Sequence, residues 1–284
     1  MLNDSPPLKF TKMQALGNDF VVVDGIRQAV ALEPRTAARI ADRHAGIGCD
    51  QVLVAEQALG NGADFRMRIF NADGGEVGQC GNGARCFGRF LLDNELTRRR
   101  EIVVETMTGL LTLYIDDSGE VRVDMGVPRF EPPGVPFLAD AEQAQYDLEV
   151  DGCRVRIAVL AVGNPHAVLF VDDVAQAPVA VLGPQIESHA RFPDRTNVGF
   201  AQVVDRGSIR LRVYERGAGE TRACGSGACA AVVAGRRLGL LDPTVAVALP
   251  GGRLGVSWQG DDSPVLLSGP AKTVFEGTVD LSQL

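Results

Sequence analysis

Short runs in which hydrophobic and polar residues alternate, or in which hydrophobic residues follow one another, recur along the whole chain. Such runs predict half-buried or fully buried strands. In the first half they lie at Lys9–Met13, Phe20–Asp24, Gln51–Glu56, Phe65–Phe70, Ile102–Glu105, Leu110–Ile115 and Val121–Met125. In the second half they lie at Arg154–Val162, Ala167–Val171, Val198–Val204, Ile209–Tyr214, Val245–Leu249, Leu254–Trp258, Val265–Leu267 and Thr273–Phe275.

A few stretches with helical periodicity interrupt these strands. Pro34 suits the first position of a helix that continues through Thr36–His44. Further helices are predicted at Asn82–Glu95, Ile186–Arg191 and Ser226–Leu238. Many strands with few helices indicate the α+β class. The proline-rich stretch Pro128–Pro136 predicts a linker between two halves.

An internal repeat relates the two halves. Cys80-Gly81-Asn82-Gly83-Ala84 recurs as Cys224-Gly225-Ser226-Gly227-Ala228, an offset of 144 residues. Upstream, Gly17-Asn18 corresponds to Gly163-Asn164 at an offset of 146 residues, and Gln51 then corresponds to Asn197. The chain therefore reads as two copies of one unit, and we expect two pseudo-symmetric lobes that share an active site between them.

In both copies a Gly-rich turn leads from a strand into a helix that begins beside the cysteine. A helix start directs backbone N–H groups at an anion and stabilises a thiolate by roughly 0.3–2 kcal/mol, which lowers a thiol pKa by at most about 1.5 units. Two thiolates about 7 Å apart would repel by about 2.4 kcal/mol at an effective dielectric constant of about 20. We therefore expect one thiolate and one thiol, the states that a two-base inversion at carbon requires.

Other interpretations of the paired cysteines stay open at this point. Cys80 and Cys224 could be small buried residues at tight helix starts, or a dithiol redox switch. A cysteine hydrolase fits less well, because it needs a Cys–His pair and gives a symmetric second cysteine no role. A third class is a non-catalytic thiol sensor or amino-acid-binding module.

Composition narrows the classes further. The chain has 284 residues, 28 Lys and Arg against 36 Asp and Glu, and a net charge of −8, which gives no reason to expect nucleic acid or an anionic membrane as a partner. It has neither a long apolar run nor a secretory signal, so we expect a cytoplasmic location. Six cysteines without a CxxC pair, and three histidines, favour free thiols over a disulfide scaffold or a structural zinc site.

The motifs together resemble diaminopimelate epimerase over nearly the whole chain after the first residues. The segments that carry the resemblance are Lys12-Met13, Gly17-Asn18-Asp19-Phe20, Gly46-Ile47-Gly48-Cys49-Asp50-Gln51, Phe70-Asn71-Ala72-Asp73-Gly74, Gln79-Cys80-Gly81-Asn82-Gly83-Ala84-Arg85-Cys86, Gly163-Asn164-Pro165-His166, Thr196-Asn197-Val198, Glu215-Arg216-Gly217 and Ala223-Cys224-Gly225-Ser226-Gly227-Ala228. Their joint order and spacing make the resemblance specific.

The resemblance implies an epimerase that uses neither a cofactor nor a metal and interconverts LL- and meso-diaminopimelate in lysine and peptidoglycan precursor synthesis. It implies that each lobe is a mostly antiparallel strand barrel wrapped around a central helix. The first lobe would comprise residues 1–125 with 270–284 and carry Cys80, and the second would comprise residues 126–269 and carry Cys224. A homodimer is also implied.

The resemblance further implies roles for individual residues. Cys80 and Cys224 match the base and acid, and His166 and Glu215 match groups that assist them. Gly81-Asn82 and Gly225-Ser226 match the backbone that binds the reacting carboxylate. The residues that match the pocket for the distal amino-carboxylate group are Asn71, Asn197, Glu215 and Arg216, and those that match further substrate-binding positions are Asn18, Gln51 and Asn164.

Chemistry supports part of this assignment. A zwitterionic distal group needs Arg for its carboxylate and Glu or amide oxygens for its ammonium. Glu215-Arg216 faces Asn71-Ala72 in the repeat, so only the second copy has such a charged pair. The alternative that keeps the fold is a proline racemase-like or phenazine-pathway isomerase-like enzyme. Cys86 and Cys229 fall inside the predicted helices, where we expect them to pack.

Overall fold

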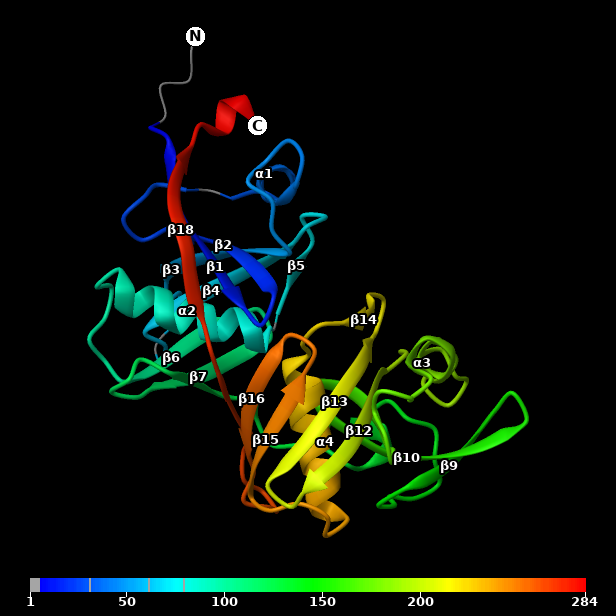
Figure 1. Ribbon diagram of the computed structural model, residues 1–284. Coiled ribbons are helices and arrows are strands. Elements are labelled where there is room, and N and C mark those ends of the chain that lie inside the picture. The colour runs from blue at the N-terminus through cyan, green and yellow to red at the C-terminus, as the bar shows by residue number, and fades with distance from the viewer. Residues whose placement is uncertain (1–5, 31, 61, 79) are drawn as a thin grey trace. The chain divides into compact units, whose positions relative to one another are not determined.

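The computed structural model describes residues 6–30, 32–60, 62–78 and 80–284 (Figure 1). The chain folds into two compact units. Unit 1 takes the described residues up to Val123 together with Gly269–Leu284, and unit 2 takes Asp124–Ser268. The described chain ends therefore both belong to unit 1, where the last strand pairs with the first.

Unit 1 is built mainly of short strands. Its elements are β1 (Leu8–Ala15), β2 (Asn18–Asp24), α1 (Pro34–Ala41), β3 (Gln51–Gln57), β4 (Phe65–Asn71), β5 (Glu76–Val77), α2 (Gly81–Asp93), β6 (Glu101–Thr106), β7 (Gly109–Ile115), β8 (Val121–Asp124), β18 (Lys272–Val279) and the short 3₁₀ helix Leu281–Gln283. Neighbouring strands are antiparallel except at β2–β3 and β4–β6, which are parallel.

Unit 2 repeats this topology strand for strand. Its elements are a 3₁₀ turn at Pro132–Gly134, β9 (Tyr146–Val150), β10 (Cys153–Val162), β11 (Asn164–Phe170), α3 (Val179–Glu187), β12 (Asn197–Asp205), β13 (Ser208–Glu215), β14 (Gly219–Thr221), α4 (Gly225–Arg237), β15 (Thr244–Leu249), β16 (Gly252–Ser257) and β17 (Leu266–Gly269). The parallel pairs β11–β12 and β13–β15 stand where unit 1 has β2–β3 and β4–β6.

The repeat extends to a strand outside the duplicated motifs. β18 pairs antiparallel with β1, and β9 pairs antiparallel with β10, the equivalent of β1. Unit 1 therefore takes this strand from the end of the chain, whereas unit 2 takes it from the residues just before its own first strand. The two copies reach the same sheet by different chain paths.

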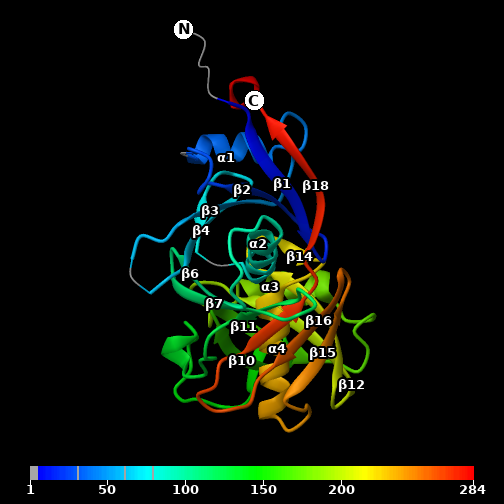
Figure 2. The same ribbon diagram turned by 90° about the vertical axis from the view of Figure 1, so that its left-hand side faces the viewer.

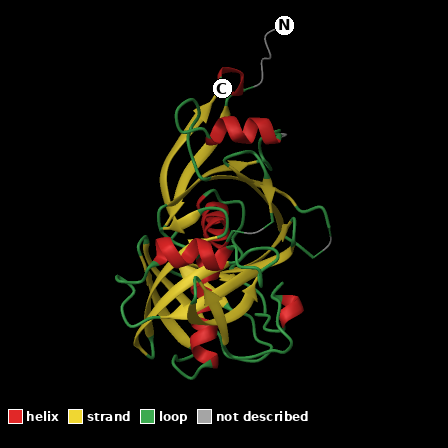
Figure 3. Ribbon diagram, turned by 90° about the vertical axis from the view of Figure 1, so that its right-hand side faces the viewer, coloured by secondary structure: helices red, strands yellow, loops and turns green. Residues whose placement is uncertain are grey.

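In each unit the strands curve around a central helix. Figures 2 and 3 show α2 nearly end-on inside a ring of strands, and Figure 1 shows α4 lying along the strands of unit 2. Both helices are buried on almost every side, with Phe87 and Leu91 of α2 and Val232 and Val233 of α4 at 0% exposure. The sequence-based prediction of two pseudo-symmetric lobes with central helices is confirmed in these features.

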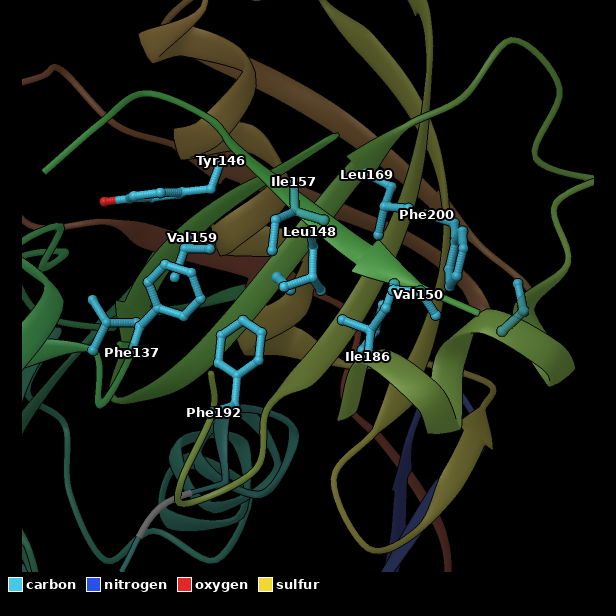
Figure 4. Packing of buried hydrophobic residues seen from close by; sticks show 14 of the residues in the cluster. Phe137, Tyr146, Leu148, Val150, Ile157, Val159, Leu169, Ile186, Phe192 and Phe200 are labelled. Atoms are coloured by element: carbon cyan, nitrogen blue, oxygen red, sulfur yellow. The ribbon is translucent and has the colours of Figure 1, made fainter. Parts of the chain in front are cut away.

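A second hydrophobic cluster lies outside each ring of strands. In unit 2 it gathers Tyr146, Leu148 and Val150 of β9 with Ile186 of α3 and Phe200 of β12 (Figure 4). In unit 1 it packs α1 against β1, β2 and β3. Each outer helix, α1 or α3, therefore covers the face of the sheet that turns away from the central helix.

Some expectations need correction. The helix predicted at Ile186–Arg191 is wrong in position, because α3 spans Val179–Glu187 and contains Gly183 and Pro184, two residues that break helical patterns. Strands β5, β9 and β14 were not predicted. Among the described helices, none is long and apolar enough to cross a lipid bilayer.

Candidate active site

Cys80 is the residue at which helix α2 begins. Its backbone is extended (φ −152°, ψ 106°), and its sulfur accepts a hydrogen bond from the backbone N–H of Gly83 at 3.3 Å. The cysteine therefore caps the helix with its side chain, as a Ser or Asp commonly does. Gly81 and Asn82 form the first turn, where backbone N–H groups point away from the helix toward any bound anion.

Two amide side chains lie beside this sulfur. The Cys80 sulfur is 3.9 Å from Asn18 Oδ1, and Asn82 Nδ2 donates to the same oxygen at 3.3 Å. Asn18 is the first residue of β2, so the turn between β1 and β2 brings it to the start of α2. The structure thus joins Asn18, Cys80 and Asn82, three of the residues that the sequence singled out.

A second amide pair links β3 to β4. Gln51 Nε2 donates to Asn71 Oδ1 at 2.8 Å, and the two residues face each other in the strand register. Gln51 Oε1 is buried and has no hydrogen-bond partner among the described residues. A buried acceptor without a partner is costly, so this oxygen is suited to accept from a bound ligand.

Cys224 caps α4 in the same way as Cys80 caps α2, but Cys224 is more deeply buried. Its sulfur accepts from the backbone N–H of Gly227 at 3.4 Å and lies 3.7 Å from Ser226 Oγ, and the residue is 4% exposed. A Cβ at Gly227 would lie 3.2 Å from that sulfur, so glycine leaves the space that the thiol occupies. Gly225 and Ser226 form the first turn of α4.

Glu215 stands next to Cys224. Its carboxylate accepts hydrogen bonds from the Thr221 hydroxyl and from the Cys224 thiol. Burial, together with the charge of Glu215, raises the pKa of Cys224 well above its usual value, and burial also raises the pKa of Glu215. The expectation that the helix start lowers the thiol pKa is therefore wrong for Cys224, because desolvation and a neighbouring carboxylate outweigh the helix end.

His166 is buried in unit 2 and holds another amide. Its Nε2 lies 2.8 Å from Asn164 Oδ1. Burial, with a further contribution from the charge of Arg216, lowers the pKa of His166 to about 3, so the imidazole is neutral and donates from Nε2 to the amide oxygen. In the aligned strands His166 occupies the position of Phe20 in unit 1.

Asn197 forms hydrogen bonds with two of the predicted segments, the one that contains Pro165 and the one that contains Arg216. Its Nδ2 donates to the carbonyl oxygen of Pro165 at 3.0 Å, and its Oδ1 accepts from the backbone N–H of Arg216 at 3.0 Å. The Arg216 side chain is exposed and donates to the carbonyl oxygen of Asp194 at 2.9 Å. Within unit 2 the structure thus groups Asn164, His166 and Asn197 with the Glu215-Arg216 turn.

Some supporting residues were not predicted. Glu187 is 3% exposed and accepts from the backbone N–H of Gly217 at 2.7 Å while pairing with Arg195 at 2.8 Å. Arg85 is fully buried and donates to Asn82 Oδ1 at 2.8 Å. A charged residue inside an otherwise apolar helix pattern is a sequence signal that could have identified Arg85.

The remaining cysteines lie away from these contacts. Cys86 and Cys229 are buried within the central helices, which confirms their expected packing role, and burial raises the pKa of Cys86 to about 12. Burial likewise raises the pKa of Cys49 to about 11, whereas Cys153 is exposed. In the described part of the chain, no group of His, Cys, Asp or Glu side chains is arranged to hold a metal ion.

Solved structures of other proteins share this fold. A hydroxyproline epimerase from Agrobacterium vitis with bound trans-4-hydroxy-L-proline superposes with a TM-score of 0.67 at 16% identity, covering 96% of this chain and 92% of that chain. A phenazine biosynthesis protein of the PhzF family from Bacillus anthracis superposes with a TM-score of 0.66 at 17% identity, covering 96% and 99%. At such low identity these likenesses establish the fold alone.

Sequence relatives are much closer. The family model for diaminopimelate epimerase matches residues 10–131 and 158–274. The chain is 56% identical over 274 residues to the diaminopimelate epimerase of Nitrosomonas europaea and 57% identical over 274 residues to that of Chromobacterium violaceum, covering 96% of this chain and 99% of each relative. The chain therefore belongs to the diaminopimelate epimerase family.

Proposed function

We propose that the protein interconverts LL-2,6-diaminopimelate and meso-diaminopimelate by a two-base mechanism in which Cys80 and Cys224 act on opposite faces of one α-carbon. The observation that carries the proposal is the pair of cysteines that cap the central helices of two topologically identical units. One sulfur removes the α-proton as thiolate, and the other delivers a proton as thiol. Inversion requires both, because a single base would return the proton to the face it left.

The surroundings of Cys224 support its role as the thiol before turnover toward one stereoisomer. The buried carboxylate of Glu215 accepts from the sulfur and raises its pKa, so the proton stays on Cys224 until a neighbouring carbanion takes it. The N–H groups of Gly81, Asn82, Gly225 and Ser226 would hold the reacting carboxylate and stabilise the negative charge that develops on it. Neutral His166 fixes the orientation of Asn164, the residue that corresponds to Asn18 in the repeat.

The distal end of the substrate explains why the second copy departs from the first. Arg216 can bind the distal carboxylate, and the oxygens of Asn71, Asn197 and Glu215 can accept from the distal ammonium. Asn18 and Gln51 complete the proposed pocket, and Gln51 Oε1, which has no partner among the residues that the structure describes, is available to a donor. A substrate with a single charged end, such as proline, leaves Arg216 without a partner.

The proposal includes the setting of the enzyme. It works without pyridoxal or metal, because the two sulfurs supply both proton transfers. It acts in the cytoplasm, where thiols stay reduced, on a precursor of lysine and peptidoglycan. We also propose a homodimer, since β18 exposes Val274 at 57% and Phe275 at 48% on a strand that pairs with β1. Light scattering that gives a monomer mass would refute the dimer.

The decisive test is incubation of the protein with LL-diaminopimelate in deuterium oxide without added pyridoxal. We expect deuterium at the α-carbon and formation of the meso isomer. A protein that neither exchanges nor inverts this substrate refutes the proposed function. Racemisation of proline in preference to diaminopimelate would favour the proline racemase-like alternative, and binding with a reversible Cys80–Cys224 disulfide as the sole chemistry would favour a thiol sensor.

A further inference from the structure

Four polar side chains form a continuous chain of hydrogen bonds beside Cys80. Asn18 Nδ2 donates to Asp50 Oδ2 at 2.9 Å, and Asn82 Nδ2 donates to Asn18 Oδ1 at 3.3 Å. Arg85 Nη2 then donates to Asn82 Oδ1 at 2.8 Å. The two amides thus lie in series between a carboxylate and a buried guanidinium, with the Cys80 sulfur 3.9 Å from the amide oxygen at the middle of the chain.

The two ends of this chain determine how each amide points. A carboxylate can only accept, so the side of Asn18 that faces Asp50 must be its nitrogen. A guanidinium can only donate, so the side of Asn82 that faces Arg85 must be its oxygen. In both amides the positions of the oxygen and the nitrogen are therefore determined by their partners, and the oxygen of Asn18 is held toward the sulfur.

The carboxylate end is itself anchored by charge. Asp50 Oδ1 accepts from Arg43 Nη2 at 2.8 Å, and Asp50 Oδ2 accepts from the backbone N–H of Asp19 at 3.1 Å. Arg43 also bonds to Asp19 at 2.6 Å, and Asp19 pairs with Lys12. Burial opposes the ionisation of Asp19, but its hydrogen bonds from Arg43 and Lys12 hold its pKa at about 2.

The second unit lacks this chain. By the repeat offsets, Thr196 stands in place of Asp50, Ser226 in place of Asn82 and Cys229 in place of Arg85. The equivalent amide, Asn164, has its oxygen bonded to His166 Nε2 instead. The two units thus hold their corresponding amides by different means, and only unit 1 places an amide between a carboxylate and a guanidinium.

We propose that Asp50 and Arg85 are positioning residues that lock the Asn18 amide with its oxygen toward the Cys80 thiol. A fixed acceptor beside the sulfur favours the protonated thiol, whereas an amide turned by 180° would present N–H to it and favour the thiolate. The lock concerns the free protein. Its value for catalysis rests on the proposed epimerase function, since it decides how readily Cys80 becomes the base.

The test compares alkylation of the full-length protein and its Asp50→Asn variant by iodoacetamide, measured for each cysteine by peptide mass spectrometry across pH 6–10. An Asn at position 50 can accept or donate, so it removes the constraint from this end of the chain and leaves Asn18 held only by its bond from Asn82 at 3.3 Å. We expect Cys80 to react about three to ten times faster at neutral pH, with the midpoint of its pH profile lowered. Buried Cys86 reports on loosening of α2 and exposed Cys153 on the reagent, and both should keep their wild-type rates.

Asp50→Asn removes a negative charge as well as a constraint on the Asn18 amide, and a control must separate these two effects on the Cys80 alkylation rate. The charged groups joined to this chain of hydrogen bonds are Lys12, Asp19, Arg43, Asp50 and Arg85, and the Cys86 thiol follows Arg85 on α2. Asp19→Asn removes the same charge as Asp50→Asn without touching the Asn18 amide, and we expect less than a two-fold change in the Cys80 rate. Equal changes in both variants, an unchanged Cys80 rate in Asp50→Asn, or a parallel rise at Cys86 would overturn the proposal.

The wild-type protein offers a measurement that does not depend on whether a variant folds. In a ¹⁵N-asparagine-labelled sample, the Asn18 side-chain N–H signals are assigned by their loss in Asn18→Asp. We expect them to exchange with solvent at least about ten-fold more slowly than a free amide, because they are bonded to Asp50. Exchange at the free rate would overturn the lock. None of these measurements uses substrate, so absence of epimerase activity would refute the proposed function and leave this result standing.

Discussion

The surroundings of Cys80 and Cys224 differ although their backbones are alike. Both sulfurs accept from the N–H three residues along, at 3.3 and 3.4 Å, and both begin the central helix of their unit. Cys80 is half-buried beside the amides of Asn18 and Asn82, whereas Cys224 is buried beside the carboxylate of Glu215. Duplication thus places two equivalent sulfurs, and the side chains that each copy has acquired make them chemically distinct.

The strand pairs next to the cysteines also differ in charge between the two units. Gln51 and Asn71 face each other in unit 1 as two neutral amides. At the equivalent register unit 2 has Asn197 and Glu215, followed by Arg216. A reaction that inverts one carbon benefits from near-mirror bases, but a substrate with a charged tail needs charge on one side only. This difference is consistent with the charged tail of the proposed substrate.

Removal of either sulfur should reduce activity more than any other change and tests whether both are needed. Cys80→Ala and Cys224→Ala should each lower epimerisation by about 10²–10⁴-fold, since each removes a proton-transfer group. The matched controls are Cys86→Ala and Cys229→Ala, which remove buried cysteines from the same two helices. These should cost about 1 kcal/mol of unfolding free energy and keep kcat within a few-fold. Full activity in either catalytic variant would break the two-base comparison.

The next effect sharpens the contrast between the two thiols. Glu215→Gln removes the charge that helps to raise the pKa of Cys224, so that pKa should fall and iodoacetamide should react with Cys224 at lower pH than in the wild type. We expect kcat to fall by about 10²-fold, measured beside the alkylation profile. Glu220→Gln is the control, because Glu220 is exposed and pairs with Arg212. An unchanged Cys224 profile in Glu215→Gln contradicts the assigned cause.

A smaller effect tests the asymmetric tail pocket. Arg216→Lys keeps the charge but loses the planar fork that binds a carboxylate through two hydrogen bonds. We expect KM for diaminopimelate to rise about ten-fold while kcat changes little, as steady-state kinetics would measure. Arg210→Lys, at an exposed position on β13, the strand that ends just before Arg216, should leave both constants unchanged. A fall in kcat at constant KM would place Arg216 at the reacting end instead.

The smallest effect concerns stability and the buried imidazole of unit 2. The pKa of His166 is lowered to about 3, below the usual 6.5. Between these two pH values the imidazole is protonated in the unfolded chain and neutral in the folded protein. Stability from this residue is complete above about pH 6.5 and is lost as pH falls toward 3. Denaturant unfolding should show about 1 kcal/mol less stability at pH 5.5 than at pH 7.5. His166→Gln should remove this dependence, whereas His44→Gln, at an exposed position, should retain it.

The sequence predicted best those features whose signals are local. Cysteines before Gly-rich helix starts predicted both central helices to within a residue or two of α2 and α4. It failed at α3, because Gly183 and Pro184 mask a helix that packing against β12 and β13 stabilises. It also missed β9, whose alternating residues Tyr146, Leu148 and Val150 have no counterpart in the repeat before β1.

The duplication, the placement of a cysteine at each helix start and the family can all be read from the amino-acid sequence, because they follow from short motifs and their spacing. The groups that surround each sulfur are visible only in the folded protein, because they come from distant parts of the chain. Asp50 reaches Asn18 across 32 residues and Glu215 reaches Cys224 through the β13–β14 turn. Proton affinity depends on burial and on neighbouring charge, and both are properties of the folded environment that no local pattern contains.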